Sequence, residues 1–315
     1  MSSIMTNTAA MTALKSLQST NAAMATTQSR ISTGFEVAEA SDNAAYWSIA
    51  TTMRSDNAAL GTVQDALGLG AAKVDVAYTG INSAIEVVDE IKTKLVAARE
   101  PGVDRSKVQA EITQLQEQLT SIASSASFNG ENWLSVDSSA TGYSDTESIV
   151  ASFNRAADGS VSVATLSVDK STTALFDANG TAGETGILDA EFNLDSDDGA
   201  TPPVTLTATV ATLDISGATV TDADIDAMIT GVETALQSMT TAAADLGASK
   251  KRINMQTDFV SNLMGAIDRG IGQLVDADMT EESTKLQALQ VQQQLGIQAL
   301  SIANGNAQNI LGLFR

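Results

Sequence analysis

Apolar side chains recur every seven residues between positions 60 and 98, which is the spacing of a helix that packs along its length on other helices. The first series of these positions is Leu60, Leu67, Val74, Ile81, Val88 and Leu95. A second series, three residues after each of the first, is Val63, Gly70, Ala77, Ala84, Ile91 and Ala98. Pro101 and Gly102 predict the end of this helix, because proline lacks the amide hydrogen that a helix interior needs.

A shorter helix is predicted directly after this stop. Asp104 is a favourable N-cap residue, because its carboxylate accepts hydrogen bonds from the free amides of a first helical turn. Apolar residues then follow at alternating spacings of four and three: Val108, Ile112, Leu115, Leu119 and Ile122. Asn129 and Gly130 predict the end of this second helix.

The heptad spacing returns, over a longer stretch, in the second half of the chain. Its first series is Ile225, Val232, Met239, Leu246, Ile253, Val260, Ile267 and Leu274. Most positions four residues later are also apolar: Ile229, Leu236, Ala243, Met264 and Ile271. Thr221 and Asp224 resemble a capping box at the start of this helix. A helix of about 50 residues would be roughly 75 Å long, so we predict a rod in which 56–126 and 222–275 pack mainly on one another.

The two ends of the chain predict helices of a different kind. The N-terminal segment carries a narrow apolar stripe among Ala, Ser, Thr, Asn and Gln: Met11, Leu14, Leu17, Met24 and Ile31. The last helix, after Thr280, carries one stripe of Leu286, Leu289, Ile297, Leu300, Leu311 and Phe314. A second stripe on the same helix is Val291, Leu295, Ile302, Ile310 and Leu313.

A helix that is apolar on two sides has too much surface to bury against a single neighbour. We therefore expect the ends to be buried among helices supplied by other subunits. The alternative is that both ends fold back onto one globular body.

The centre of the chain, 137–220, predicts a small β-rich insertion. Ile149, Ala151 and Phe153 recur at every second position, Asp158-Gly159 is a hairpin signal, and the alternation resumes at Val161 and Val163. A second strand-like run, 205–210, follows a pair of prolines. Gly, Asp, Ser and Thr fill the remaining positions, so we expect a surface that faces water.

Charge is distributed in agreement with this division. The formal net charge is −21, with only 17 Lys and Arg residues. Residues 286–314 contain no charged side chain, and 1–35 contain only Lys15 and Arg30. By contrast, 136–226 carries sixteen acidic residues against Arg155 and Lys170, a net −14. Charge-poor ends around an acidic centre predict that the ends are buried and that the centre faces solvent.

The composition argues against several classes of function. Too few basic residues are present to neutralise a phosphate backbone or an anionic membrane surface. The chain has no Cys and no His, which removes thiolate nucleophiles, imidazole bases and soft metal sites. The first residues lack the basic and apolar regions of a cleaved secretory signal, and no apolar run is long enough to span a bilayer. If the protein leaves the cell, we expect a route that does not use a cleaved signal peptide.

Several short motifs at both ends resemble bacterial flagellin. The block 28–34 (Gln-Ser-Arg-Ile-Ser-Thr-Gly) is similar to the family's Arg-Leu-Ser-Ser-Gly stretch, and 40–45, followed by Ile49-Ala50, to its Asp-Asp-Ala-Ala segment. The C-terminal motifs lie at 276–279, 293–296, 303–304 and 308–315. The resemblance covers about 1–135 and 222–315 and leaves out the centre, as a variable domain would.

This sequence departs from the family pattern in three places. Asn43 replaces an Asp, Asn306-Ala307 lacks a common Pro, and Tyr46-Trp47 replaces a small pair. The Tyr-Trp pair resembles the rhizobial, alphaproteobacterial branch of the family, whose cells make several flagellins.

The resemblance implies a mainly α, hairpin-shaped subunit with long coiled-coil helices from both ends and a small β-rich central insertion. Residues 1–40 with 277–315 would form an inner coiled-coil domain, 41–136 with 221–276 a helical rod, and 137–220 an outer variable domain. Such a subunit polymerises into the flagellar filament used for swimming.

The stripes and the motif positions together define an expected polymerisation interface. From the N-terminal part we expect Leu14, Leu17, Met24, Arg30, Ile31, Gly34, Asp42 and Asn43. From the C-terminal part we expect Leu289, Leu295, Leu300, Ile302, Asn304, Ile310, Leu311, Leu313, Phe314 and Arg315. We expect no catalytic, cofactor-binding or metal site.

The resemblance also implies partners and a location. These are further copies of the chain and sister flagellins, a cytoplasmic export chaperone, the flagellar type III export apparatus, and hook-associated junction and cap proteins. Nucleic acid and membrane are not expected partners. The expected location is the extracellular filament.

Three other readings stay open from the sequence. Acidic clusters such as 195–198 and 222–226 could be paired carboxylates of an enzyme or Ca²⁺ ligands, although they lack the spacing of a Ca²⁺ loop. A monomeric adhesin could display the β-rich centre. A hook–filament junction protein would share flagellin-like ends and differ in its number of copies per filament.

Overall fold

The computed structural model describes residues 7–179, 186–194, 206–217 and 220–312. Three of the expected interface residues, Leu313, Phe314 and Arg315, lie outside the described residues. The side chains of Ile310 and Leu311 also lie outside what is described, although their backbone belongs to the last helix.

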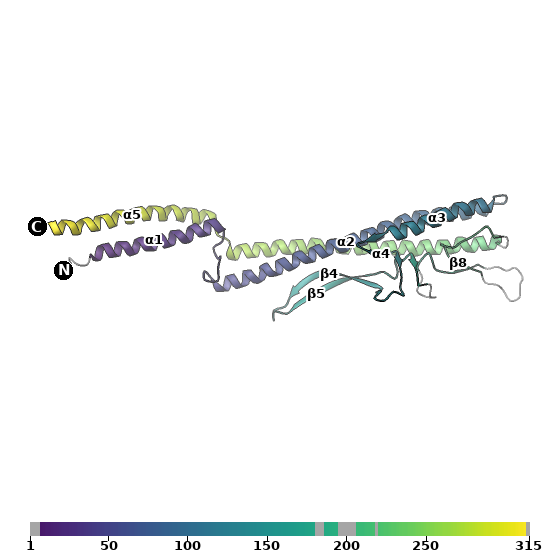
Figure 1. Cartoon of the computed structure of the whole chain (residues 1–315), viewed down its shortest axis with the longest axis horizontal. Helices are drawn as coiled ribbons and strands as arrows, with labels where there is room; N and C mark the ends of the chain where they lie inside the picture. The colour runs from purple at the N-terminus through teal and green to yellow at the C-terminus, as the bar shows by residue number, and fades with distance from the viewer. Residues whose placement is uncertain (1–6, 180–185, 195–205, 218–219, 313–315) are drawn as a thin grey trace. The chain divides into compact units, whose positions relative to one another are not determined.

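Long helices and a few short strands make up the chain (Figure 1). The helices are α1 Thr8–Thr33, α2 Ala44–Ala98, α3 Arg105–Ser125, α4 Asp222–Val275 and α5 Met279–Gly312. The strands between α3 and α4 are β1 Ser127–Phe128, β2 Glu131–Asn132, β3 Ser135–Val136, β4 Thr146–Arg155, β5 Val161–Asp169, β6 Phe176–Asp177, β7 Phe192–Leu194 and β8 Leu206–Ala208. The predicted fold class, mainly α with a small β-rich centre, is confirmed.

The chain divides into two compact units. Unit 1 contains residues 1–58 and 263–315, and unit 2 contains 59–262. Helices α2 and α4 each contribute to both units. The three-part division expected from the sequence stays a prediction.

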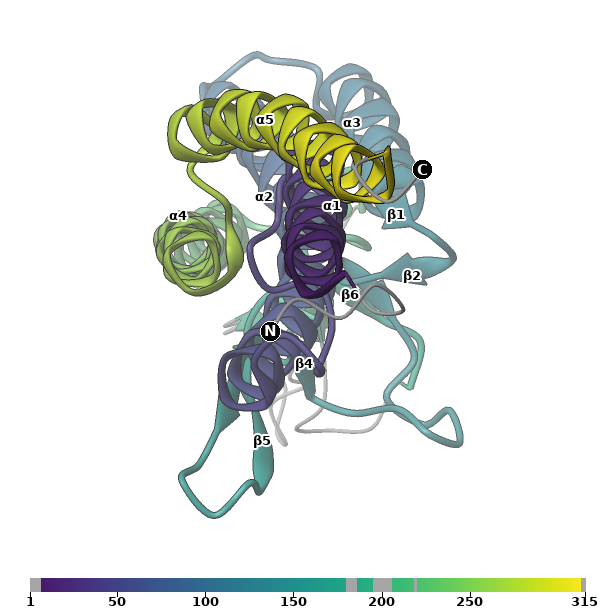
Figure 2. The same ribbon diagram turned by 90° about the vertical axis from the view of Figure 1, so that its left-hand side faces the viewer.

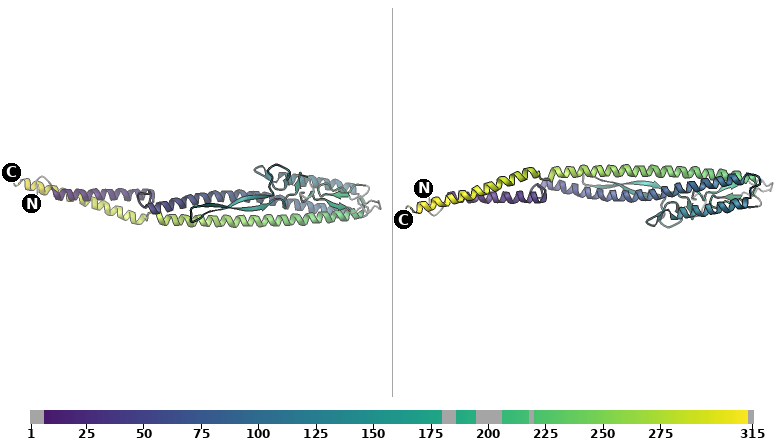
Figure 3. Two further views of the ribbon diagram at one scale, coloured as in Figure 1. Left: turned by 90° about the horizontal axis from the view of Figure 1, so that it is seen from below. Right: turned by 90° about the horizontal axis from the view of Figure 1, so that it is seen from above.

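In unit 2, α2 and α4 run side by side (Figure 3), and their heptad positions form the core. Every residue of the first α2 series is at most 2% exposed, and the α4 series is fully buried from Ile225 to Val260. On α4 the second buried series is Met228, Ala235 and Ala242. These positions follow the first series by three residues. Of the positions expected four residues after the first series, Ala243 and Ile271 are also buried, and Ile229 and Leu236 are half-buried. Periodicity indicates a buried stripe, but neighbouring elements decide which flank of it they cover.

The predicted helix starts are confirmed in atomic detail. Asp104 Oδ1 accepts hydrogen bonds from the Ser106 amide at 3.2 Å and the Ser106 hydroxyl at 2.6 Å. Asp224 Oδ2 accepts from the Thr221 amide at 2.6 Å, and the Asp224 amide donates to Thr221 Oγ1 at 3.3 Å. This reciprocal pair is a capping box with Asp in the place of Glu.

The predicted central hairpin is also confirmed. Strands β4 and β5 pair antiparallel, with Ile149 opposite Leu166 and Phe153 opposite Val163. The turn between them contains Gly159 at φ 86°, a conformation that glycine adopts without strain. The strand-like run near 205–210 contains β8, which pairs with β7.

Three glycines in the long helices of unit 2 receive apolar side chains from the central segment. A Cβ atom on Gly70 of α2 would lie 2.6 Å from Ile149 Cγ2, and one on Gly80 would lie 2.5 Å from Leu134 Cδ1. On α4, a Cβ on Gly231 would lie 2.5 Å from the Phe192 ring. Each glycine is a socket, because even a methyl group there would overlap the docked side chain.

Polar side chains hold the returning segment 206–217 on α3. Gln109 Nε2 donates to the Leu213 carbonyl at 3.1 Å, and its Oε1 accepts from the Ile215 amide at 2.9 Å. Gln116, two turns later on α3, donates to the Val210 and Leu213 carbonyls at 3.0 and 3.1 Å. The side chains of Leu213 and Ile215 are buried, and these bonds satisfy the Leu213 carbonyl and the Ile215 amide.

Candidate interaction surface

Helices α1 and α5 of unit 1 lie next to each other and run antiparallel (Figure 2). Three polar contacts set their register. Asn7 Nδ2 donates to the Ala303 carbonyl at 2.9 Å, and Gln293 Nε2 donates to Asn21 Oδ1 at 2.8 Å. Arg30 Nη1 donates to Glu282 Oε1 at 3.0 Å. Close approach is allowed by Gly296, where a Cβ atom would lie 3.2 Å from Leu17 Cδ1.

Glu282 is a buried carboxylate within a surface that carries little charge. It is 6% exposed, and its Oε2 has no hydrogen-bond partner among the described residues. Burial alone would raise the pKa of Glu282. Hydrogen bonds from Arg30 and Thr27 and the charge of Lys285 outweigh burial, so its pKa lies below the ordinary value. The carboxylate therefore stays ionised and ties the start of α5 to the end of α1.

Only one side of α5 is covered by α1. Leu286, Leu289 and Leu300 are half-buried, together with Gly296. Three apolar residues point the other way and are exposed: Val291 at 56%, Leu295 at 58% and Ile302 at 66%. At 100° per residue, these three fall on the opposite side of the helix from Leu289 and Leu300.

Helix α1 also leaves apolar side chains uncovered. Leu17, Met24 and Ile31 are half-buried, whereas Met11 is 61% and Leu14 45% exposed. Exposed apolar stripes of this length on two paired helices are unusual for a protein that works alone. We name Met11, Leu14, Val291, Leu295 and Ile302 the terminal stripe.

The expected interface residues fall into three groups. Leu14, Leu295 and Ile302 belong to the terminal stripe, and Asn304 is also exposed. The residues half-buried in unit 1 are Leu17, Met24, Ile31, Leu289 and Leu300. The third group is Arg30, Gly34, Asp42 and Asn43, which form hydrogen bonds within unit 1.

The connection from α1 to α2 depends on this third group. Gly34 ends α1 at φ 77°, and its carbonyl accepts from the Ala277 amide at 2.9 Å. Asp42 Oδ2 accepts from the amides of Ala38 and Glu39 at 3.0 and 3.1 Å. Asn43 Oδ1 accepts from two amides of the first turn of α2, both at 3.2 Å. These motif residues therefore have a structural role within one chain, whatever they contact in an assembly.

Sequence reasoning missed the role of Phe35. Its backbone bridges to Asp276, and the Arg54 guanidinium lies 5.1 Å from its ring centre. The neighbouring apolar cluster of Val37, Ala50, Ile271 and Val275 is buried. A single aromatic residue after a helix-ending glycine was the available signal.

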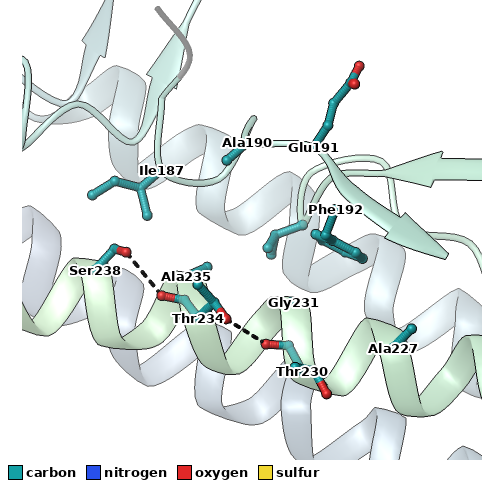
Figure 4. A pocket seen from close by; sticks show the side chains of 11 residues that line it. Ile187, Ala190, Glu191, Phe192, Ala227, Thr230, Gly231, Thr234, Ala235 and Ser238 are labelled. Carbon is teal, nitrogen blue, oxygen red and sulfur yellow. Dashed lines mark hydrogen bonds between the residues drawn. The ribbon is translucent and has the colours of Figure 1, made fainter. Parts of the chain in front are cut away.

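A cavity of about 390 Å³ lies in unit 2 between α4 and the segments around β7 (Figure 4). Thr230, Thr234 and Ser238 follow each other by one helical turn along its wall. Each hydroxyl donates to the carbonyl one turn earlier, at 2.9 to 3.0 Å. The lining holds no base beside these hydroxyls to activate them, and Glu191 points away from them in Figure 4.

The described part of the chain contains no cluster of three or more acidic side chains arranged to hold a metal ion. No helix within it is long and apolar enough to cross a bilayer. The terminal stripe is therefore the strongest candidate for function.

Comparison with known proteins shows the family of this chain. The family description of the bacterial flagellin N-terminal helical region matches residues 4–139, and that of the C-terminal helical region matches 229–314. Flagellin C of Rhizobium meliloti strain 1021 is 53% identical, and the alignment covers 100% of both chains. The chain belongs to the bacterial flagellin family.

Other flagellins are nearly as similar. Flagellin A of Rhizobium meliloti strain 1021 is 47% identical, and a flagellin of Brucella melitensis biotype 1 is 45% identical, each over 100% of both chains. The predicted resemblance to the rhizobial branch is confirmed. A crystal structure of Bacillus cereus flagellin aligns with 66% of this chain and 94% of its own, at 16% identity and a TM-score of 0.39.

Membership of the family gives the protein its function. This flagellin is a structural subunit of the bacterial flagellar filament, and flagellins polymerise with one another. The family is structural and non-enzymatic. No observation favours the hook–filament junction protein as an alternative.

Proposed function

We propose that the terminal helices α1 and α5 are the polymerisation element of this filament subunit. The observation that carries the proposal is the terminal stripe, which stays exposed after α1 and α5 have packed on each other. Burial of the exposed part of each large apolar side chain contributes about 1 kcal/mol. Neighbouring subunits would supply that burial, and residues 286–314 bring no charge that would oppose it.

The same proposal includes the remaining interface residues expected from the sequence. Leu17, Met24, Ile31, Leu289 and Leu300 hold α1 and α5 together, and Asn304 lies on the exposed side. Arg30, Gly34, Asp42 and Asn43 place both helices relative to the start of α2. Ile310, Leu311, Leu313, Phe314 and Arg315 belong to the same proposal on the sequence motif that they share.

We further propose that this surface determines how the subunit is handled before assembly. An exposed, uncharged apolar helix needs cover in the cytoplasm, which supports an export chaperone bound to α5. Membership of the flagellin family supports the extracellular location and type III export. It also supports a junction complex and a cap complex at the filament ends. Catalysis has no part in the proposal, and neither does a cofactor.

Making the terminal stripe polar is expected to prevent assembly at ordinary concentrations. The variant carries Val291→Thr, Leu295→Gln and Ile302→Thr, which change shape little and add no charge. Loss of about 3 kcal/mol of burial per subunit should raise the critical concentration by about 100-fold. Sedimentation of seeded protein over a concentration series, with electron microscopy of the pellets, measures this value.

A matched control makes the result specific. Leu69→Gln, Val96→Thr and Val103→Thr alter side chains of unit 2 that are 48%, 54% and 39% exposed. This control should assemble like the parent chain, whereas a chain ending at Lys285 should form no filaments. Equal loss in the control and in the polar-stripe variant, or filaments from the truncated chain, would refute the terminal helices as the polymerisation element.

Free subunits should differ from filaments in their sensitivity to protease. The ends gain most of their burial from other subunits, so their ordering entropy is compensated only in the lattice. We expect limited digestion of dilute monomer to remove both ends and to leave a core close to 56–275. Mass spectrometry of the fragments tests this, and ends that resist digestion in dilute monomer would contradict it.

A further inference from the structure

Two exposed patches outside the terminal stripe have complementary character. The first, which we name the aromatic face, consists of Phe35, Tyr46 and Trp47 in unit 1. These side chains are between 37% and 47% exposed. Aromatic residues are enriched at protein interfaces, because they bury a large area at a small cost in side-chain entropy.

The aromatic face has an acidic rim. Glu36, Glu39 and Asp42 are all exposed and lie in the segment that joins α1 to α2. Glu36 lies 3.9 Å from Arg30 and is 60% exposed, and the Arg54 guanidinium of α2 lies over the Phe35 ring. The rim is therefore net negative and open to solvent.

The second patch, which we name the basic face, lies on α4 in unit 2. Met255 and Phe259 are one turn apart and 55% and 57% exposed, and Lys251 precedes Met255 by one turn. Arg252 flanks these residues. At 100° per residue they occupy about a quarter of the helix circumference, on the side opposite the buried Ile253 and Val260.

Basic residues without an ion pair are a minority among those that the structure describes. Most of its Lys and Arg side chains form ion pairs within unit 1 or unit 2, such as Lys92 with Glu233 and Arg99 with Asp226. Within the described residues, Lys251 and Arg252 form no ion pair. Asp258 is the acidic residue that shares their face, so the patch stays net positive.

We propose that the aromatic face of one subunit binds the basic face of another copy of this chain in the filament. Charge complementarity identifies the occupant: the acidic rim with its aromatic centre faces the basic rim with Met255 and Phe259 at its centre. A contact between two different patches is heterologous, so each added subunit leaves one patch of each kind free and growth continues as a helix. The proposal rests on the filament role and adds a contact that does not involve the terminal stripe.

Tryptophan fluorescence provides a direct reporter of this contact. The chain has two tryptophans, of which Trp133 is 3% exposed and Trp47 37% exposed. In a Trp133→Phe background, with helix content checked by circular dichroism, Trp47 alone emits. We expect its emission to shift to shorter wavelength on assembly and its quenching by acrylamide to fall. Unchanged emission in filaments seen by microscopy would overturn this contact and leave the terminal-stripe proposal standing.

Charge reversal tests the identity of the two faces. Arg252→Glu should raise the critical concentration by about tenfold, and Glu39→Arg should do the same. The double variant should recover most of the loss, because the pair is restored with opposite sign. Lys107→Glu is the matched control, since Lys107 is a Lys with 83% of its side chain exposed on α3 and its reversal changes net charge equally.

The outcomes separate specific contact from general repulsion. An equal effect of Lys107→Glu and Arg252→Glu would show that overall charge alone matters and would overturn the proposal. If Trp47 emission still shifts when Arg252→Glu assembles, and Glu39→Arg does not restore the critical concentration, the aromatic face binds a surface other than the basic face. That result would also overturn the proposal.

Discussion

Replacing Gly70 by alanine will lower the free energy of unfolding of unit 2 by about 1–3 kcal/mol, the usual cost of overpacking a core. The new Cβ would lie 2.6, 2.7 and 3.0 Å from three carbons of Ile149. Ile149 is 6% exposed and β-branched, and it is held in β4 opposite Leu166, so it cannot move aside without disturbing the hairpin. Thermal and denaturant unfolding followed by circular dichroism will measure the change.

Gly68 is the matched control for this substitution. It lies on the same helix two residues earlier, and a Cβ there meets nothing within 4 Å. Gly68→Ala should therefore stabilise the chain by up to about 1 kcal/mol, the difference in helix propensity. A second test is repair: Ile149→Ala should recover part of the loss in Gly70→Ala. If Gly70→Ala proves neutral or stabilising, the glycine is not a socket and the hairpin docks by other contacts.

Removing Arg30 alone is expected to destabilise filaments strongly, by about 3 kcal/mol per subunit in Arg30→Met. The substitution leaves Glu282 buried at 6% exposure without its 3.0 Å partner. This estimate is at the low end for a buried pair, because the Arg30 side chain is 25% exposed. The temperature at which filaments disassemble, followed by light scattering, is the measurement.

Removing both Arg30 and Glu282 should lower the stability of the filament much less than removing Arg30 alone. In Arg30→Met with Glu282→Leu, no buried charge is left unpaired, because Glu36 and Lys285, which lose their partners, are 60% and 48% exposed. Most of the stability lost in Arg30→Met should therefore return. A double variant as unstable as the single one would mean that the ion pair itself supplies the stability. It would also contradict a role in which the pair mainly sets the register of α1 on α5.

The same pair predicts one component of the response to acid. The folded pKa of Glu282 lies below the ordinary value, so the carboxylate contributes stability above its unfolded pKa. That contribution is lost as the pH falls through the folded pKa. Filaments of the parent chain should lose stability in this range, and the double variant should lack this component.

Some of the candidate site was readable from the sequence because the evidence was local. The two-sided apolar pattern of 286–302 predicted that one neighbour could not cover α5, and Val291, Leu295 and Ile302 are indeed exposed. By contrast, Arg30 and Asn43 were expected at the interface on motif resemblance alone. The contact of Arg30 with Glu282 could not be read from spacing, because it joins residues 252 positions apart. The cap of Asn43 on the first turn of α2 is local, and an Asn directly before a helix was an available signal for it.

The sequence by itself determined the long helices, the central hairpin and the first buried series of α2 and α4. The heptad series of α2 and α4, the caps at Asp104 and Thr221, and the β4–β5 hairpin each depend on a repeat or a turn signal within a few residues. Only the tertiary structure decided how these elements meet. The sockets at Gly70, Gly80 and Gly231 and the covered flank of α4 depend on docking between segments distant in the chain, and helical or strand periodicity carries no information about that docking.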